Sequence, residues 1–193
     1  MDWILASASP RRRELLERLH IPSLRVVPPL DDECAPNGLS PDALVRTLAA
    51  HKAREVCDRL SSEPGDRVII AADTVVVLDG TILGKPRDAA HAAQMLHALS
   101  GRQHEVYTGV CVLRGDRQLC EAERSTVRFR SLSHREINAY INTGEPLDKA
   151  GAYGIQNFGS LFVAEIHGDY FNVVGLPLCR LGLMLQKLDV MLL

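Results

Sequence analysis

Aromatic residues are scarce in this chain, and their scarcity excludes one class of function. They make up 5% of the 193 residues, too few for the stacking platforms on which proteins bind single-stranded nucleic acid. Charge of one sign is not in excess either, because the net charge is only −2. The chain therefore has no overall field that would attract nucleic acid or an anionic membrane, and any anion site must be a local cluster of cations.

Long apolar runs are also missing. No stretch approaches the roughly 20 apolar residues that cross a bilayer, so we expect no membrane partner. The first residues, MDWILAS, carry an acid where a signal peptide needs basic residues, and their apolar run is too short for its hydrophobic region. These features predict a cytoplasmic protein. The composition, 46% hydrophobic and 24% charged, is ordinary for a globular protein. The length predicts one domain over residues 1–193, or one domain with two lobes.

The cysteines lack any paired or metal-binding pattern. There is no Cys-x-x-Cys pair, and no histidines stand at zinc-ligand spacing from them. Their number is odd and their positions are scattered: Cys34, Cys57, Cys111, Cys120 and Cys179. We therefore expect five reduced thiols. Neither the cysteines nor the serines stand in a Cys-His or nucleophile-elbow signature, so covalent catalysis has no support.

Strand and helix signals alternate irregularly along the chain. Strands are expected at 3–6, on both sides of the Asp79-Gly80 hairpin signal within 67–86, at 104–113, at 124–130, and in LFVAEI and FNVVG. Helices are expected to begin at Ser9-Pro10, Ser40-Pro41, Asp88, the capping box Ser133–Glu136, and Pro177. The segment 26–41 is expected to be irregular. This alternation, with at least one hairpin, predicts an α/β fold with a mixed sheet.

Three arginines follow the first helix start. A helix N-terminus carries about half a positive charge, so cations there are unfavourable by about 0.3–1 kcal/mol each. Arg11, Arg12 and Arg13 nevertheless directly follow Ser9-Pro10. Backbone N–H groups and forked guanidinium donors suit phosphate oxygens, so a bound polyphosphate would turn the repulsion into attraction. The alternative is a solvated basic turn, because the glycine signatures of known phosphate loops are absent.

A carboxylate interrupts the apolar run Ile69–Val77. Asp73 would be costly there if it were ionised and unpaired, so it requires a cation, a metal ion or strong hydrogen-bond donors. At a sheet edge that faces a cleft it could hold a divalent ion or activate a water. The alternative is a carboxylate that backbone donors satisfy. Lys85, in the stiff turn Leu83–Pro86, suits a reach to a phosphate, or it is an ordinary lysine at a hairpin end.

An acidic run lies in the proline-rich segment. Asp31-Asp32-Glu33 could supply a ligand to magnesium, which takes one or two protein carboxylates and completes its shell with water and phosphate oxygens. One acid of this run together with Asp73 would suffice. Otherwise the run is a solvated loop, as short acidic runs usually are.

Eight segments occur in a fixed order between residues 5 and 178. They are LASASPRRRELL, DDE, HKA, AADTVVV, GKPRD, LSGRQHEVYTG, EPLDKAGAYGIQ and NVVGLPL. Each is weak alone, but the ordered set resembles the Maf-like nucleoside triphosphate pyrophosphatases. The resemblance implies an elongated mixed β-sheet flanked by helices, with two lobes around a nucleotide cleft, and often a homodimer. It also implies hydrolysis of a nucleoside triphosphate between the α and β phosphates, with Mg²⁺ or Mn²⁺ as the cofactor.

The resemblance further assigns roles to residues of this chain. Asp73 matches the family's general base, and together with Glu33 it would hold the divalent cation. The polar positions that line the nucleotide cleft match Ser9, Arg11, Arg12, Glu33, Lys52 and Lys85. The positions linked to substrate choice match Arg11, Thr74 and Gln156. Whether Asp73 is the metal ligand or the proton acceptor stays open, because one carboxylate cannot easily serve as both.

Within the family, the segment DKAGAYGIQ resembles the branch that acts on dTTP and UTP. The chain departs from that branch at Asn157-Phe158-Gly159, which replaces a more glycine-rich turn, and at Asp169 and Phe171, which replace small residues. These departures concern the base side of the cleft. Two alternatives are therefore a pyrophosphatase for 7-methyl-GTP or other modified nucleotides, and a non-catalytic nucleotide-sensing regulator of cell division.

Overall fold

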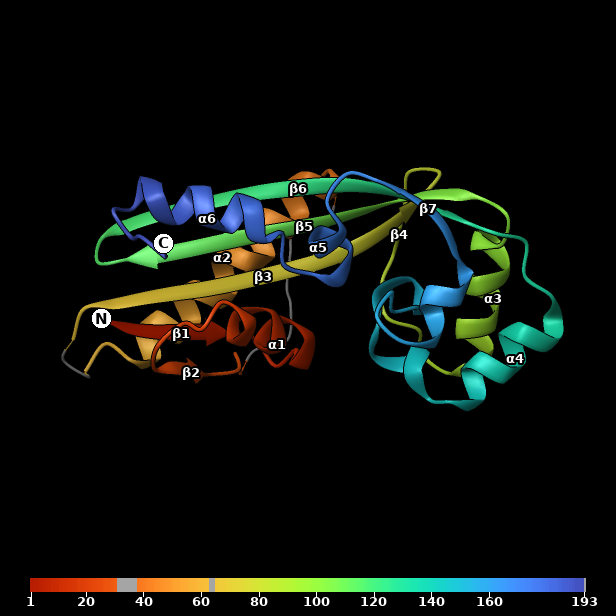
Figure 1. Ribbon diagram of the computed structural model, residues 1–193, viewed down its shortest axis with the longest axis horizontal. Coiled ribbons are helices and arrows are strands. Elements are labelled where there is room, and N and C mark those ends of the chain that lie inside the picture. The colour runs from red at the N-terminus through yellow and green to blue at the C-terminus, as the bar shows by residue number, and fades with distance from the viewer. Residues whose placement is uncertain (31–37, 63–64, 193) are drawn as a thin grey trace. The chain divides into compact units, whose positions relative to one another are not determined.

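A computed structural model of the chain describes residues 1–30, 38–62 and 65–192 (Figure 1). Its helices and strands are β1 (Asp2–Ala6), α1 (Pro10–Arg18), β2 (Leu24–Val26), α2 (Pro41–Arg59), β3 (Arg67–Leu78), β4 (Thr81–Leu83), α3 (Ala89–Leu99), β5 (Gln103–Arg114), β6 (Arg117–Phe129), α4 (His134–Asn142), β7 (Val163–His167), α5 (Tyr170–Val174) and α6 (Leu178–Lys187). Short 3-10 turns lie between α4 and β7. Within the described ranges, no helix has both the length and the apolar character needed to cross a membrane.

The strands form one seven-stranded mixed sheet. Along the sheet the order is β2-β1-β3-β5-β6-β7, and β4 pairs with β3. Strand β1 runs parallel to β2 and β3, whereas β4 is antiparallel to β3 and β7 is antiparallel to β6. The predicted α/β class with a mixed sheet flanked by helices is therefore confirmed.

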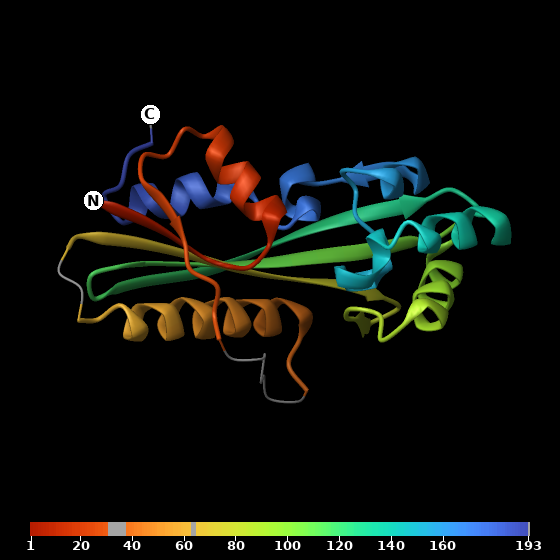
Figure 2. The same ribbon diagram turned by 90° about the horizontal axis from the view of Figure 1, so that it is seen from below.

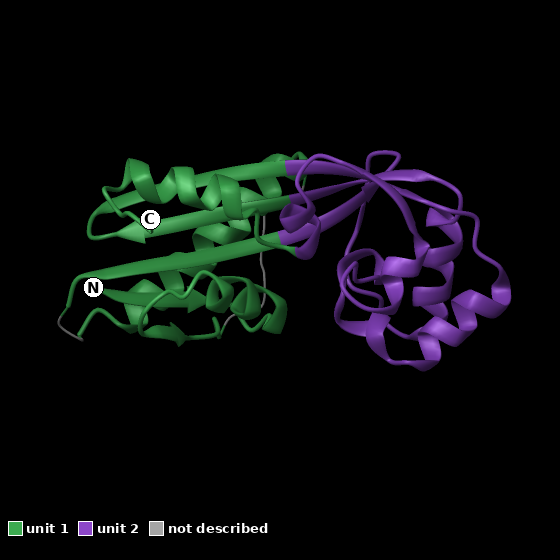
Figure 3. Cartoon of the chain, viewed as in Figure 1, with its two compact units in different colours: residues 1–73, 108–123, 175–193 green, residues 74–107, 124–174 purple. Residues whose placement is uncertain are grey.

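The chain divides into two compact units (Figure 3). Unit 1 comprises residues 1–73, 108–123 and 175–193, and unit 2 comprises residues 74–107 and 124–174. Two units agree with the two lobes that the resemblance implies. The nucleotide cleft stays a prediction.

Unit 1 is layered. Helix α2 covers one face of its strands, and α1 and α6 cover the other (Figure 2). Ala49 and Ala53 of α2 are fully buried against Ala6 and Ala71 of β1 and β3. A side chain at Gly109 of β5 would collide with the α2 backbone. Small residues on both surfaces therefore let α2 approach the sheet closely, and this fixes the helix that carries Lys52.

Unit 2 has a core of its own, built around rings. Phe129 of β6 packs edge-on against Tyr153 and His104, with ring centroids 4.7 and 5.0 Å apart. Tyr140 of α4 packs edge-on against Phe162 at 4.9 Å. Buried aliphatic side chains of α3 and α4 complete the cluster. Edge-to-face contacts of this kind add attraction beyond simple burial of area.

Several element boundaries lie where the sequence predicts them. The side chains of Ser40 and Asp88 accept hydrogen bonds from the first turns of α2 and α3. Ser133 and Glu136 form the predicted capping box of α4. The two residues of the predicted turn at Asp79-Gly80 have positive φ angles of 50° and 77°, as a tight hairpin between β3 and β4 requires. Local chemistry therefore determines these ends.

Three segments differ from the sequence prediction. FNVVG is not a strand, because α5 occupies it, and Asp169 Oδ1 accepts a hydrogen bond from Phe171 N at 2.7 Å at the helix start. A short apolar run does not distinguish strand from helix, so this error has a known cause. Strand β2, which the sequence did not predict, has only three residues. Strand β6 begins at Arg117, earlier than predicted, directly after the turn Gly115-Asp116.

The prediction of five reduced thiols is wrong for Cys111 and Cys120, which form a disulfide between β5 and β6. A two-residue turn at Gly115-Asp116 places Arg114, the end of β5, opposite Arg117, the start of β6. Three residues further from the turn on each strand, Cys111 lies opposite Cys120. Their Cα atoms are 4.2 Å apart. Recognition of this turn in the sequence would have predicted that the two cysteines lie opposite each other. Cys57 and Cys179 are free thiols. Cys34 lies outside the described residues.

Candidate active site

The turn between β1 and α1 carries the first predicted site residues. Pro10 is the first residue of α1, and Ser9 stands at the N-cap with an extended backbone. The Ser9 side chain makes no capping hydrogen bond, and its backbone N–H donates to the buried hydroxyl oxygen of Ser7 at 3.2 Å. The first N–H groups of α1 are therefore not satisfied by a serine cap, and such groups suit an anion.

Arg12 is the arginine that the interior of unit 1 holds in place. Its Nε donates to the carbonyl oxygen of Gly175 at 2.8 Å, and its Nη1 donates to Ser7 Oγ at 3.2 Å. The residue is only 9% exposed. Sequence reasoning did not single out Ser7, although its place two residues before the N-cap serine was a usable signal. A buried guanidinium with two fixed donors is preorganised for a forked anion such as phosphate.

The other two arginines have different surroundings. Arg13 is exposed and forms an ion pair with Glu17 one turn along α1, with 2.6 Å between Nε and Oε1. The solvated-turn interpretation therefore applies to Arg13. Arg11 is half-buried at the same helix start.

Asp73 forms an ion pair with Lys52 inside unit 1. Lys52 Nζ of α2 lies 2.5 Å from Asp73 Oδ1 of β3, and the two side chains are 11% and 8% exposed. The sequence required a cation, a metal ion or strong donors at Asp73, and Lys52 is such a cation. Loss of either partner would leave a charge in a site with little water, which is costly.

Strand pairing sets the Lys52–Asp73 pair beside the β1–α1 turn. Strands β1 and β3 are parallel, with Ala6 opposite Ala71. Ser7 begins the turn directly after Ala6, and Asp73 lies two residues beyond Ala71. The carboxyl end of β1 is the kind of place where α/β proteins commonly bind ligands, and Asp73 lies at the same level within β3. Unit 1 therefore brings the start of α1 and a buried carboxylate–ammonium pair to one level of the sheet.

Unit 2 carries the other described residues that the sequence singles out. Thr74 is half-buried in β3, Lys85 is exposed after β4, and Gln156 is half-buried in the loop between the second and third 3-10 turns. The Gly84 carbonyl oxygen, next to Lys85, accepts a hydrogen bond from Gly151 N at 3.1 Å. The backbone of unit 2 therefore joins the Lys85 turn to the segment that leads to Gln156.

Tyr140 and Glu145 hold the loop around Gln156 at both ends. Gly154 N donates to Tyr140 Oη at 3.1 Å, and the Tyr140 hydroxyl donates to Glu145 Oε1 at 2.9 Å. Glu145 Oε2 accepts from Phe158 N at 3.2 Å. Burial raises the pKa of Tyr140, so this hydroxyl stays a donor. Sequence reasoning missed both residues, because no local pattern connects α4 to residues 154–158.

Lys149 was also missed. It is 8% exposed, and its Nζ donates to the Glu145 carbonyl oxygen and to Asp148 Oδ1, both at 2.6 Å. A side chain at Gly154 would come within 2.6 Å of Lys149 Cε. The lysine therefore packs into the segment DKAGAYGIQ itself and fills the space that Gly154 leaves.

His104 is a buried titratable group in the core of unit 2. Its Nε2 lies 2.8 Å from the Tyr153 hydroxyl, and its Nδ1 has no hydrogen-bond partner in the described part of the chain. Burial lowers the pKa of His104 to about 4, because desolvation disfavours the charged imidazolium. The ring is therefore neutral at neutral pH.

Asp73 is the described carboxylate to which the predicted divalent cation would bind. Among residues 1–30, 38–62 and 65–192, no group of three or more His, Cys, Asp or Glu side chains could hold a metal ion. Glu33 lies outside these ranges, so its role in binding metal or substrate stays a prediction. A carboxylate is nonetheless the donor that magnesium prefers, and one or two suffice when water and phosphate oxygens complete the shell.

The chain is similar to known proteins over nearly its whole length. Residues 2–188 match the family described as Maf-like protein. The chain is 52% identical to the dTTP/UTP pyrophosphatase of Symbiobacterium thermophilum, over 95% of this chain and 92% of that protein. It is 54% identical to the dTTP/UTP pyrophosphatase of Moorella thermoacetica, over 92% and 90%. A solved structure, the nucleoside-triphosphatase / dITP/XTP pyrophosphatase of Mycobacterium abscessus, has a TM-score of 0.46 at 16% identity, covering 98% and 94%.

Proposed function

The chain belongs to the Maf-like protein family, and we propose that it is a nucleoside triphosphate pyrophosphatase that hydrolyses dTTP and UTP. Water cleaves the bond between the α and β phosphates, and the products are a nucleoside monophosphate and pyrophosphate. One observation carries this proposal: two proteins named dTTP/UTP pyrophosphatases are more than half identical to the chain over more than nine tenths of its length.

In the proposed reaction, Arg12 and Ser9 bind phosphate oxygens at the start of α1. Two hydrogen bonds already fix the Arg12 guanidinium, so little side-chain entropy is lost when a phosphate binds. A fixed cation also needs no rearrangement as negative charge moves toward the leaving pyrophosphate. Arg11, Lys52 and Lys85 are proposed as further phosphate-binding residues, and Thr74 and Gln156 as residues that select the base. The resemblance supports these assignments.

Asp73 is proposed as the general base. An ionised carboxylate can accept a proton from the attacking water, and such positioned groups contribute about 10²–10⁴-fold to a rate. The ion pair with Lys52 supports this role, because it holds the carboxylate in one orientation at a site with little water. Lys52 therefore orients the base in addition to supplying positive charge for the phosphates.

A divalent cation, Mg²⁺ or Mn²⁺, is proposed as the cofactor, with Asp73 and Glu33 as the residues that would hold it. Such a cation neutralises phosphate charge and polarises the phosphorus–oxygen bonds. We further propose that residues 1–193 form a single Maf-like domain that works in the cytoplasm, and that two copies form a homodimer, as the resemblance implies. Size-exclusion chromatography with light scattering would report the oligomeric state directly.

The test of the proposed function is a substrate panel in labelled water. The full chain is incubated with dTTP, UTP, CTP, GTP and 7-methyl-GTP, with Mg²⁺, Mn²⁺ or a chelator, in H₂¹⁸O. We expect pyrophosphate from dTTP and UTP and the ¹⁸O label in the monophosphate, because the water attacks the α phosphorus. Orthophosphate as the first product, or label in pyrophosphate, would contradict the reaction.

The same panel separates the alternatives. A preference for 7-methyl-GTP would assign the chain to the modified-nucleotide pyrophosphatases. Binding of triphosphates with no turnover under any metal condition would favour a nucleotide-sensing regulator. Asp73→Asn tests the proposed base, and Asp58→Asn is its matched control. Asp58 is exposed, and each variant removes one carboxylate charge from unit 1.

A further inference from the structure

Unit 1 has a groove on the side of α2 that the proposed function does not use. Arg46, His51 and Arg54 line it from one face of the helix, and Gln118 and Cys120 line it from β6. Arg54 lies eight residues after Arg46 and three after His51, and residues at these separations lie on the same side of a helix. The cavity measures about 460 Å³, which lies within the range of small-molecule sites.

The groove is cationic. Two arginines, Arg46 and Arg54, line it, and no carboxylate does so among its described lining residues. Arg46 forms an exposed ion pair with Asp42. Arg54 has no carboxylate partner in the described chain, and only its Nε is engaged, as a donor to Gln118 Oε1 at 2.8 Å. Its two terminal nitrogens therefore remain available, and the ligand that suits this groove carries carboxylates.

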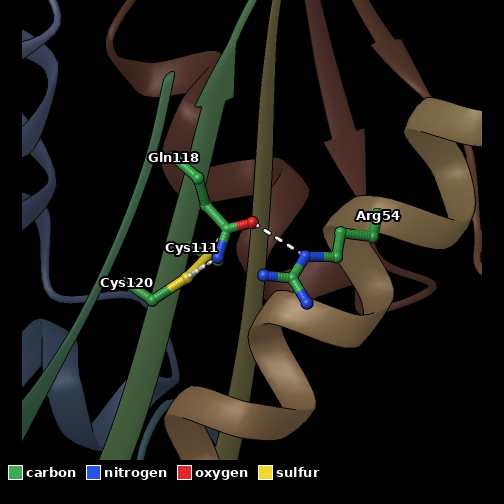
Figure 4. Close-up of a disulfide and its surroundings, with 4 residues drawn as sticks. All are labelled: Arg54, Cys111, Gln118 and Cys120. Carbon is green, nitrogen blue, oxygen red and sulfur yellow. Dashed lines mark hydrogen bonds between the residues drawn. A yellow bond between two sulfur atoms is a disulfide. The ribbon is translucent and has the colours of Figure 1, made fainter. Parts of the chain in front are cut away.

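Only one cysteine of the disulfide, Cys120, lines the groove; Figure 4 shows the disulfide with Gln118 and Arg54 beside it. Cys111 is fully buried in the core of unit 1, whereas Cys120 is half-buried and lines the groove. Gln118 Nε2 donates to Cys120 Sγ at 3.2 Å, and Arg54 orients that amide from the other end. Reactive cysteines occur in partly exposed, electropositive surroundings of this kind. An external thiol can therefore reach Cys120 but not Cys111.

We propose that Cys111 and Cys120 are a reversible dithiol–disulfide pair, and that the groove binds the small carboxylate-bearing thiol that exchanges with Cys120. In reduction, the thiolate of this ligand attacks Cys120 Sγ, a mixed disulfide forms at Cys120, and Cys111 leaves as a thiolate that takes up a proton. A second ligand thiolate then attacks the ligand's own sulfur and releases Cys120. Two ligand thiols become one ligand disulfide, and the protein gains two thiols, so electrons and protons balance.

The proposal also reconciles the disulfide with the expected cytoplasmic location. Disulfides in the cytoplasm are usually transient, catalytic or redox-sensing, because the thiol pool keeps most cysteines reduced. A pair that opens and closes with that pool fits this pattern, whereas a permanent structural bridge does not. Nothing in the proposal depends on pyrophosphatase activity.

The first test follows the cysteines of the full chain in mixtures of reduced and oxidised glutathione, used as the probe. Free thiols are alkylated, and peptides are identified by mass spectrometry. We expect the Cys111–Cys120 disulfide to give way to two alkylated thiols as the mixture becomes reducing, and Cys111→Ser to accumulate glutathione on Cys120. A pair that stays in one state across all mixtures, or glutathione on Cys111 in Cys120→Ser, would overturn the proposal.

The second test leaves both cysteines in place. The reduced protein is oxidised either by oxidised glutathione, which carries carboxylates, or by hydroxyethyl disulfide, which is neutral. Arg54→Ala should lower the rate with oxidised glutathione, relative to the rate with hydroxyethyl disulfide, by about tenfold. This is the equivalent of about 1.4 kcal/mol for a hydrogen bond to a charged group. Arg135→Ala, which removes an exposed arginine of unit 2, should leave the ratio unchanged. An unchanged ratio in Arg54→Ala would show that the groove does not bind the probe.

Discussion

Lys52 Nζ of α2 lies 2.5 Å from Asp73 Oδ1 of β3, with both side chains about nine-tenths buried. This pair joins the helix on one face of unit 1 to the strand whose parallel neighbour leads into α1. It therefore couples the carboxylate proposed as the base to the packing of α2. Small residues at the helix–sheet contact make this distance possible.

Asp73→Asn should lower turnover of dTTP by about 10²–10⁴-fold, because the amide cannot accept the proton of the attacking water. Steady-state kinetics measured well below the unfolding temperature, with Asp58→Asn as the control, test this. Turnover close to that of the natural chain would remove Asp73 from the chemistry.

Lys52 and Asp73 should be coupled in stability. Each single variant, Lys52→Met or Asp73→Asn, removes one charge of this buried ion pair, whereas the double variant removes both. We expect a coupling free energy of about 1–3 kcal/mol in the double-mutant cycle, measured as the free energy of unfolding in urea. Strictly additive losses would mean that the ion pair does not contribute in solution.

Arg12→Ala and Arg13→Ala offer a comparison of adjacent arginines. Arg12 is buried with two fixed donors, and Arg13 is paired with Glu17 at the surface. Loss of one preorganised donor to a developing charge costs about 10²–10³-fold in turnover, so Arg12→Ala should be severely impaired and Arg13→Ala nearly unaffected. Equal effects on kcat/KM would contradict the different roles that their surroundings indicate.

Glu145→Gln should impair substrate use through the loop that carries Gln156. The two carboxylate oxygens of Glu145 accept hydrogen bonds from the Tyr140 hydroxyl and from Phe158 N. Glutamine has an NH₂ group in place of one of these oxygens, so one of the two hydrogen bonds that hold the loop is lost. We expect kcat/KM for dTTP to fall by about tenfold, and Glu145→Gln in a Gln156→Ala background to cause little further loss. The exposed Glu165→Gln is the control, and full additivity with Gln156→Ala would argue against this connection.

The stability of the fold should depend on pH through His104. Its pKa is lowered from 6.5 to about 4 in the folded chain, so the unfolded chain binds more protons between these values. The stability that the neutral form of His104 contributes to the free energy of unfolding is complete above pH 6.5 and is lost as the pH falls toward 4. We expect His104 to make the free energy of unfolding about 2–3 kcal/mol lower at pH 4.5 than at pH 7.5.

Urea titrations of the natural chain and of His104→Gln at both pH values isolate the contribution of His104. The contributions of the other titratable groups are common to both proteins and cancel when the two pH dependences are subtracted. Glutamine cannot titrate, so the pH dependence of the variant should be smaller by that amount. The same pH dependence in both proteins would mean that His104 charges as easily in the folded state as in the unfolded one.

Residues close in sequence determined the element ends and the need for a partner at Asp73. The capping residues of α2, α3 and α4 and the hairpin at Asp79-Gly80 act within a few residues of themselves, so their sequence signals were reliable. FNVVG failed because a short apolar run has no decisive period, and a cap at Asp169 selects the helix. The pairing of Cys111 with Cys120 was not predicted, because the turn at Gly115-Asp116, which sets the register of the two strands, was not recognised.

Only the tertiary structure decided which groups meet. The sequence by itself required a cation, a metal ion or donors for Asp73, but the choice of Lys52, 21 residues away, depends on how α2 packs on β3. The same holds for Arg12 on the Gly175 carbonyl, 163 residues away, and for Tyr140 and Glu145 around Gln156. The physical reason is that capping and turn formation depend on local backbone geometry, whereas contacts between distant side chains exist only after the chain has closed around its cores.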